Sequence, residues 1–211
     1  MGDARTEIIG RVRAALAETE SYVDPVMAPP GAGPSDVLAR FAERVADYRA
    51  EVVRCSIDEV TSRVAAALPA GAMVVVPSGL GIDVPGAIVD DGFGAADLDR
   101  IDAVVTACRI GIAETGTIIL DHESDQGRRA ITLVPDRHVC VVRAGQVVAD
   151  VPDAMPLLDP QRPLTWISGP SATSDIELER VEGVHGPRTL IVVLVDDGSS
   201  NPAAAGDRDE S

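Results

Sequence analysis

The amino-acid sequence predicts an α/β domain built on a largely parallel β-sheet. Residues 72–76, 103–107 and 190–195 are short, almost continuously apolar runs, as expected of parallel strands that are covered on both faces. Between these apolar runs lie segments whose apolar residues recur at helical spacing. The chain is 45% apolar but only 2% aromatic over 211 residues, so it has enough aliphatic side chains for a full core. We therefore expect a doubly wound α/β sheet of mixed strand direction with a helical amino-terminal segment.

The amino-terminal region is predicted to be helical. Apolar residues recur at helical spacing over residues 3–20, and a second helix with one apolar side follows. That side carries Val37, Leu38, Phe41, Val45 and Tyr48. Ser56 and Glu59 have the spacing of a capping box, which predicts a third helix that ends near Leu68.

The chain is expected to divide into three regions. Proline and glycine residues between 24 and 34 interrupt regular structure, so residues 1–34 are interpreted as a helix and a linker. Residues 35–195 form the α/β domain. Residues 196–211 form an acidic tail of small polar residues that we expect to be disordered. The aliphatic first helix behind its linker favours self-association into a homo-oligomer.

From residue 72 onward, predicted strands and helices alternate. A strand at 87–90, a short helix at 95–101 and the strand at 103–107 follow the first buried run. Short polar turns then separate predicted strands at 117–120, 130–134 and 139–142, which favours antiparallel pairing over about residues 117–142. The remaining expected elements are a helix within 147–158, a strand at 164–167, a helix from Ser174 and the last strand at 190–195.

The charge of the chain argues against several classes of partner. With 34 acidic and 18 basic residues the formal net charge is −16, which disfavours nucleic acid and an anionic membrane surface. All 18 basic residues are arginine, so Schiff-base chemistry and a P-loop lysine are excluded. No apolar run is long enough to span a bilayer and the charged start does not resemble a signal peptide, so we expect a cytoplasmic protein.

The cysteines give no sign of a metal centre. Cys55, Cys108 and Cys140 lie far apart and lack any Cys-x-x-Cys spacing, so the sequence predicts neither an iron–sulfur cluster nor a zinc finger in this chain. Cys108 and Cys140 have apolar neighbours and are interpreted as buried small hydrophobes. We expect no cofactor in the chain.

His122 is the one histidine with several acidic neighbours. Asp121, Glu123 and Asp125 surround it in sequence, a combination that could hold a metal ion. A charged, solvated turn explains the same residues, and we favour that interpretation. We therefore expect no metal site.

Residues 168–173 are the first candidate for a ligand site. Ser168, Gly169, Ser171 and Thr173 follow a predicted strand and precede a helix whose start, from Ser174, has a capping-box pattern. Exposed N–H groups at a helix amino terminus favour a phosphate or a carboxylate. In the alternative interpretation every hydroxyl serves a turn or a cap. Because the hydroxyls outnumber what one cap requires, we favour the ligand site.

His185 lies where the chain returns from that helix. It is flanked by glycines and followed by Gly186 and a proline, so its backbone is expected to turn tightly. The side chain could act as an acid, a base or a hydrogen-bond donor to an anion. It could equally cap the carboxyl end of the helix. Spacing alone does not separate these roles.

The turn at residues 113–117 is the second candidate. Glu114 and Thr115 precede Gly116, which permits close backbone approach, and Thr117 opens an apolar strand. Glu114 could be a nucleophile or a general base, and the alternative is a turn with a solvated carboxylate. His138, which follows a Pro-Asp-Arg turn, could face the same cleft.

Together these segments resemble the LUD-domain family, in particular its LutC/YkgG type. The likeness spans roughly residues 70–195 and is carried by the Glu-Thr-Gly-Thr motif at 114–117, by His138 and by the Ser-Gly-Pro-Ser and His-Gly-Pro motifs. The resemblance implies a fold similar to the NagB/RpiA/CoA-transferase class. It also implies a role in oxidation of L-lactate to pyruvate beside two iron–sulfur partner proteins.

The resemblance also implies which positions matter. They are Glu114, Thr115, Gly116, Ser171, Asp175, Glu177, His185 and Gly186. One departure is that relatives commonly have a basic residue after Gly-Pro-Ser, where this chain has Ala172. If that cation contacts an anionic ligand in relatives, Arg188 or a partner chain would have to replace it.

These observations lead to a hypothesis about function that leaves catalysis open. The chain has neither cluster-ligand spacing nor a dinucleotide fingerprint. We therefore expect a subunit that binds an anionic ligand, or that assembles or regulates redox partners, without carrying the redox centre. The alternatives are an independent transferase, isomerase or ligase that uses Glu114, and a binding module without chemistry.

Overall fold

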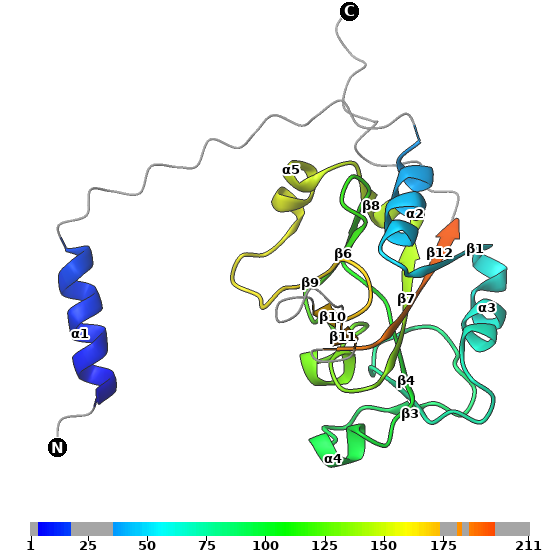
Figure 1. Ribbon diagram of the computed structural model, residues 1–211, viewed down its shortest axis with the longest axis horizontal. Coiled ribbons are helices and arrows are strands. Elements are labelled where there is room, and N and C mark those ends of the chain that lie inside the picture. Colours follow the sequence, from blue (N-terminus) through cyan, green and yellow to red (C-terminus); the bar gives the residue numbers. More distant parts are fainter. Residues whose placement is uncertain (1–3, 18–35, 174–180, 183–185, 197–211) are drawn as a thin grey trace, which may run out of the picture.

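A parallel sheet forms the centre of the fold. The computed structural model describes residues 4–17, 36–173, 181–182 and 186–196 (Figure 1). Within these ranges, six strands pair in parallel in the order β1-β12-β7-β4-β2-β3. In that order they are Glu51–Ser56, Thr189–Asp196, Arg137–Arg143, Ala103–Thr106, Val74–Val76 and Ile88–Val89. The predicted α/β fold with a parallel sheet is confirmed.

A second, smaller sheet is mixed. Among the described residues its order is β8-β5-β6-β9, and these strands are Val147–Val148, Ile110–Ile112, Thr117–Leu120 and Thr165–Ile167. β6 pairs antiparallel with both β5 and β9, whereas β5 and β8 are parallel. A separate antiparallel pair joins β10, Ala172–Thr173, to β11, Val181–Glu182.

Helices cover both faces of the parallel sheet. The α-helices are α1 Ala4–Leu16, α2 Val37–Asp47, α3 Val60–Ala67, α4 Ala95–Leu98 and α5 Val151–Ala154. The 3₁₀ turns are η1 Ile57–Glu59, η2 Arg129–Thr132, η3 Ala144–Gln146 and η4 Met155–Leu157. Val60 and Val64 of α3 pack on one face, with Val139 and Val193 in the same apolar cluster.

The opposite face of the parallel sheet is covered by α2 and the small sheet together. Phe41 and Val45 of α2 share an apolar cluster with Ile118 of β6 and with Val142 and Val192 of the central strands. This face is therefore where the Glu-Thr-Gly-Thr turn, the small sheet and the central strands meet.

Two helices begin at capping side chains, and the second of these caps is predicted from the sequence. The Asp36 carboxylate accepts a hydrogen bond from the Ala39 N–H at 2.8 Å and so caps α2. The Glu59 carboxylate accepts from the Ser56 N–H at 3.1 Å, as the predicted capping box requires. Local sequence signals therefore fix the helices on each side of the sheet.

The expected antiparallel region over residues 117–142 is wrong in part. Residues 130–134 form no strand, because η2 spans Arg129–Thr132 and the Thr132 hydroxyl donates to the Arg129 carbonyl at 3.1 Å. The strand predicted at 139–142 is present as β7, but it is a parallel strand between β12 and β4. A short apolar run does not reveal its partners, which explains both errors.

Other differences concern strands and helices that are very short. The helix expected within 147–158 is divided into β8, α5 and η4, with Pro152 and Pro156 in the first turns of the two helical pieces. Strands β1 and β5 are additional to the prediction. The edge strand β1 carries Glu51 and Arg54 and buries only Cys55, so it lacks the apolar signal of a central strand. Over the described residues, no helix has the length and apolar character that crossing a membrane requires.

Candidate functional site

A pocket of about 140 Å³ gathers several of the predicted site residues. Its lining comprises Arg129, Thr132, His138, Thr165, Trp166, Ile167, Ser168, Gly169, Pro170, Ser171, Gly186, Pro187 and Leu190. His138 and Leu190 are paired neighbours near the amino ends of β7 and β12, and Ser168 follows the carboxyl end of β9. The site thus lies where β9 of the small sheet meets the amino ends of two central strands.

The loop at 168–171 is held by α2 and by the chain before β12. Gly169 has φ +92°, and a Cβ there would lie 2.7 Å from Tyr48 Cβ, so only glycine fits. The Ser171 N–H donates to the Pro187 carbonyl at 2.8 Å. This bond brings the Ser-Gly-Pro-Ser motif and the Gly186–Pro187 turn to the same pocket.

His138 is buried, and polar neighbours hold its ring. Its ring is 1% exposed, and Nε2 lies 2.8 Å from the Oγ1 atom of Thr106 on the neighbouring strand β4. His138 also interacts with the buried Cys140 side chain, two residues further along β7, and it lines the pocket. From the sequence, His138 could face the same cleft as the other candidates. In the structure it lines one pocket with residues of the 168–171 loop.

Arg129 is the cation of the pocket and is not among the sequence candidates. Its Nη1 atom donates to the Thr132 carbonyl at 3.1 Å and to Thr132 Oγ1 at 3.2 Å. No carboxylate of the described residues pairs with it, and desolvation lowers the pKa of Arg129 from its ordinary value. The sequence signal that could have identified it is an Arg-Arg pair at the end of a turn in an acidic chain.

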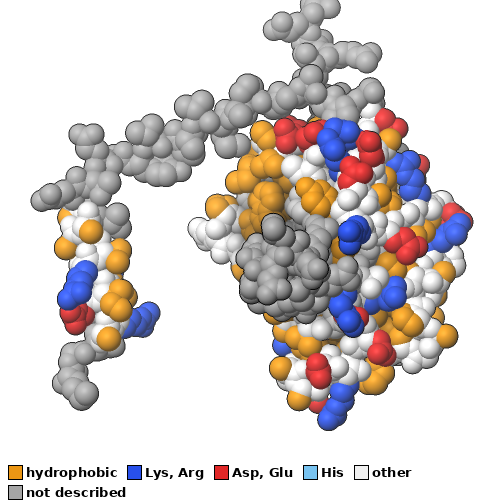
Figure 2. Space-filling model, in the orientation of Figure 1, with side chains coloured by type: hydrophobic (Ala, Val, Ile, Leu, Met, Phe, Trp, Pro, Cys, Tyr) orange, Lys and Arg blue, Asp and Glu red, His pale blue; other side chains and the backbone are white. Residues whose placement is uncertain are grey.

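The pocket lining contains no Asp or Glu among the residues that the structure describes. The chain as a whole carries 34 acidic residues, and acidic and basic side chains are interspersed over the face shown in Figure 2. Arg129 and His138 therefore make this pocket more favourable to an anion than the surrounding surface.

Glu114 lies outside this pocket and pairs with two arginines of α2. Arg40 donates to the Glu114 carboxylate from Nε and Nη2 at 3.3 Å, and Arg44 donates from Nη2 at 3.3 Å. Hydrogen bonding to Arg40, followed by its charge, holds the pKa of Glu114 below the ordinary value. The carboxylate is thus ionised and engaged in ion pairs that join the turn to α2.

Gly116 and the threonines of the motif connect α2 to the pocket. Gly116 has φ +59°, and a Cβ there would lie 2.7 Å from the Arg44 carbonyl carbon, so α2 occupies the space that a ligand was expected to approach. The Thr115 hydroxyl donates to Thr117 Oγ1 at 2.8 Å, and Thr117 Oγ1 lies 2.8 Å from Ser168 Oγ. This chain of hydroxyls orients Ser168 at the pocket.

Arg188 lies at a different cavity. It donates to Asp136 from Nε at 2.6 Å and from Nη2 at 2.8 Å. Both residues line a polar cavity of about 580 Å³ at the amino edge of the parallel sheet, apart from the pocket of Ser168. A further cavity of about 410 Å³, with Cys55 and Leu194 in its lining, lies at the carboxyl ends of β1 and β12 and includes none of the predicted site residues.

Three predicted site residues, Asp175, Glu177 and His185, lie outside the described residues. So does the body of the helix expected from Ser174. Residues 172–173 and 181–182 on either side of it pair as antiparallel strands β10 and β11, and Thr173 stands opposite Val181 in that pair.

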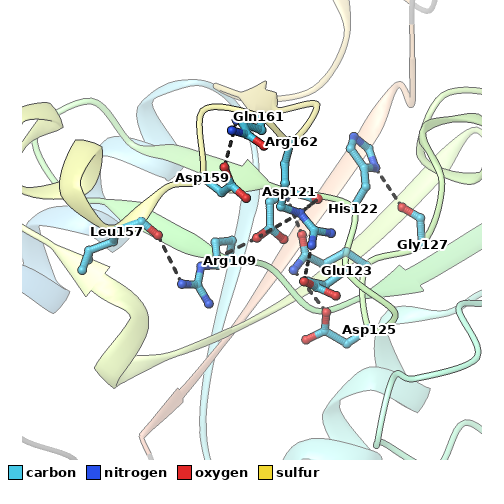
Figure 3. A network of polar contacts seen from close by, with 11 residues as sticks. Arg109, Asp121, His122, Glu123, Asp125, Gly127, Leu157, Asp159, Gln161 and Arg162 are labelled. Carbon is cyan, nitrogen blue, oxygen red and sulfur yellow. Dashed lines mark hydrogen bonds and ion pairs between the residues drawn. The ribbon is translucent and has the colours of Figure 1, made fainter.

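The acidic residues around His122 form a network with arginines (Figure 3). Asp121 lies between Arg109 at 3.7 Å and Arg162 at 4.0 Å, and Arg162 also pairs with Glu123. His122 Nδ1 lies 2.8 Å from the Gly127 carbonyl, and Nε2 lies 2.9 Å from Thr165 Oγ1. Both ring nitrogens are therefore engaged.

This network stabilises the part of the pocket lining that contains Thr165. Through Thr165, His122 connects the loop after β6 to the lining of the pocket. Across the described part of the chain, no group of three or more His, Cys, Asp or Glu residues could hold a metal ion. Two guanidinium groups beside Asp121 would also oppose a cation there.

Comparison with known proteins identifies the family. A family model described as the LUD domain matches residues 95–195. Lactate utilization protein C of Deinococcus radiodurans is 43% identical over 206 residues, which cover 92% of this chain and 96% of that protein. Lactate utilization protein C of Bacillus subtilis is 31% identical over 107 residues, or 47% of this chain and 44% of that protein.

A solved structure is also similar. It is the crystal structure of a DUF162 family protein from Deinococcus radiodurans, with 42% sequence identity and a TM-score of 0.65. The match covers 75% of this chain and 96% of that one. Because the LUD-domain model matches residues 95–195 and a relative is 43% identical over 92% of the chain, the chain belongs to the LUD-domain family.

Proposed function

We propose that this chain is a cytoplasmic subunit of a system that oxidises L-lactate to pyruvate, and that it binds an anionic ligand in the pocket beside Ser168. The observation that carries the proposal is the 43% identity to a lactate utilization protein C over 96% of that protein's length. The finer fold assignment, to the NagB/RpiA/CoA-transferase class, is part of the same proposal. A parallel sheet with helices on both faces is compatible with it.

The size and charge of the pocket support a small organic acid as the ligand. Drug-sized ligands typically occupy about 300–1,000 Å³. The pocket of about 140 Å³ is smaller than that and suits a molecule of a few heavy atoms. Arg129 supplies the positive charge that such an acid requires.

Partner proteins are needed in this proposal because oxidation of a hydroxy acid releases two electrons. All three cysteines are buried, and their spacing in the sequence is unlike that of cluster ligands. We assign the electron-accepting iron–sulfur clusters to partner subunits. Exposed Met155, Leu157 and Trp166 provide apolar surface for docking, and apolar side chains gather near α5 on the face shown in Figure 2.

Deletion of the gene followed by growth on L-lactate tests the proposal. We expect the deletion strain to lose growth on L-lactate, to keep growth on pyruvate, and to recover with the intact gene. Affinity purification of the tagged chain from lactate-grown cells should also recover iron–sulfur proteins. Normal growth of a deletion strain that has no second copy of the gene would refute the assignment to lactate oxidation.

A further inference from the structure

We propose that Arg129 and His138 form a carboxylate-binding site, in which the guanidinium holds the carboxylate of a small monocarboxylic acid and His138 contacts the rest of the ligand. The inference deepens the proposed function, on which it rests for taking the anion to be a carboxylate. In this proposal Arg129, and not Arg188, is the cation of the site.

The two adjacent arginines of the 128–129 turn have different roles. Arg128 is fully engaged, because it donates to both Asp90 carboxylate oxygens and to the Phe93 carbonyl. Arg129 donates from Nη1 to the carbonyl and the hydroxyl of Thr132. Among the described residues its Nε and Nη2 groups have no partner. They therefore provide the two parallel donors that a carboxylate binds best.

Thr132 and η2 fix the direction of the Arg129 side chain. Thr132 is 1% exposed, and its hydroxyl donates back to the Arg129 carbonyl at 3.1 Å. The guanidinium is thus attached to a buried group of its own turn, and this limits its rotamers before any ligand arrives. A cation held in this way loses less side-chain entropy on binding.

His138 supplies a second polar contact at the base of the pocket. Because Nε2 is within hydrogen-bond distance of buried Thr106 Oγ1, the ring has a fixed orientation where it lines the pocket. The remaining lining combines apolar Trp166, Ile167 and Leu190 with hydroxyl side chains, which are those of Thr132, Thr165, Ser168 and Ser171. This combination suits an acid with one charged end and a short, partly polar carbon body, and the apolar residues fit such a body better than the uniformly polar surface of inorganic phosphate.

Arg188 cannot serve this pocket in the described structure. Its two hydrogen bonds to Asp136 direct it to the other cavity, where carboxylates of Asp99 and Asp102 are also present. Arg129, and not Arg188, is therefore the arginine that lines the pocket of Ser168.

The only tryptophan of the chain, Trp166, lines the pocket and gives a direct readout. We would titrate the full-length chain with L-lactate, pyruvate, propionate, inorganic phosphate and the neutral amide of lactic acid, and follow tryptophan fluorescence. The variants are R129Q, R129K and the matched control R100Q, which removes one exposed arginine that lines none of the cavities described above. Circular dichroism verifies that each variant is folded.

We expect at least one of the three carboxylates to bind saturably at millimolar concentrations, and lactamide and phosphate to bind much more weakly. R129Q should weaken carboxylate binding by about 10- to 100-fold, as loss of a charge-assisted hydrogen bond predicts, whereas R100Q should bind like the wild type. R129K keeps the charge and should fall between them. If R129Q does not fold, a loss of affinity in R129K relative to R100Q carries the same information.

Three results would overturn the proposal: no saturable carboxylate binding, equal binding of lactate and lactamide, or equal affinity in R129Q and the wild type. These results are independent of the growth experiment. Carboxylate binding that depends on Arg129, in a protein whose deletion leaves growth on lactate intact, would refute the lactate role and retain this site. Loss of growth on lactate, in a protein that binds no carboxylate, would retain the lactate role and refute this site.

Discussion

Arg128 and Asp90 form a two-point ion pair, with Nε 2.7 Å from Oδ2 and Nη2 2.8 Å from Oδ1. Asp90 directly follows β3, and its Oδ1 atom also accepts from the N–H groups of Gly92 and Phe93. The pair therefore attaches the turn that carries Arg129 to the edge of the parallel sheet. Arg129 depends for its position on a carboxylate that it does not touch.

The variant D90N tests this attachment. It keeps the shape of the side chain but removes the charge, so we expect the free energy of unfolding to fall by about 1–3 kcal/mol. Carboxylate affinity should also fall, by less than in R129Q. The control D91N removes an exposed carboxylate one residue away. Urea denaturation and Trp166 fluorescence measure the two effects, and equal stability of D90N and D91N would contradict the structural role.

The pH dependence of D90N follows from the same pair. Hydrogen bonding to Arg128 lowers the pKa of Asp90 below its ordinary value of 3.8. A lowered pKa in the folded state means that the stabilisation is fully present above the ordinary value and is lost as the pH falls through the lowered one. The difference in stability between the wild type and D90N should thus be full at pH 7 and shrink as the pH falls below about 4.

Gly116 is expected to be intolerant of any side chain. In G116A the new Cβ would lie 2.7 Å from the Arg44 carbonyl carbon in the backbone of α2, which cannot move alone. The control G71A has a similar positive φ, +74°, with no atom within 4 Å. We expect G71A to lose about 1–2 kcal/mol of unfolding free energy from backbone strain, and G116A about 2–5 kcal/mol from strain and overpacking. Similar losses in both would show that the contact with α2 is unimportant.

The strands that could be predicted from sequence are those with a continuous apolar signal. Val74–Val76, Ala103–Thr106 and the last strand are buried along nearly their whole length, so their composition reports their environment. β1 is a half-exposed edge strand and β5 is only three residues long. β1 pairs with β12, more than 100 residues away, and such a partner leaves no local pattern. β5 is too short to show a clear period of its own.

For the site, sequence reasoning located the loops but not the cation. Ser168, Ser171, Gly186 and His138, all candidates from sequence, line one pocket. Arg128 and Arg129 are adjacent cations just before an apolar run that resembles a strand, but the place of Arg129 at the pocket depends on the 3₁₀ turn and on the Asp90 pair. Neither follows from the local pattern of apolar residues.

Glu114 is expected to contribute to stability and not to ligand binding. Because Arg40 lowers its pKa, the ion pair stabilises the fold above the ordinary carboxyl value of 4.5 and is lost as the pH falls below it. E114Q should therefore unfold at lower urea concentration at pH 7, and this difference should vanish in acid. Trp166-monitored carboxylate binding should be unchanged.

E43Q is the comparison variant for Glu114. It also removes a partner of Arg40, at 3.0 Å, but from a more exposed position, so its effect on stability should be smaller. A normally stable E114Q protein that fails to restore growth on lactate would contradict the structural role and favour a catalytic one.

The hydroxyl of Thr106 is expected to position His138. T106V has nearly the same shape but leaves Nε2 buried without a partner, which should cost about 1–3 kcal/mol of unfolding free energy. T106S restores the hydroxyl and loses only a methyl group, at about 1 kcal/mol. If the hydroxyl orients the ring, T106V should also weaken carboxylate binding, and T106S should restore it. Equal affinity in T106V and T106S would mean that Thr106 supports the fold alone, because both variants alter the core but only one alters the position of the imidazole.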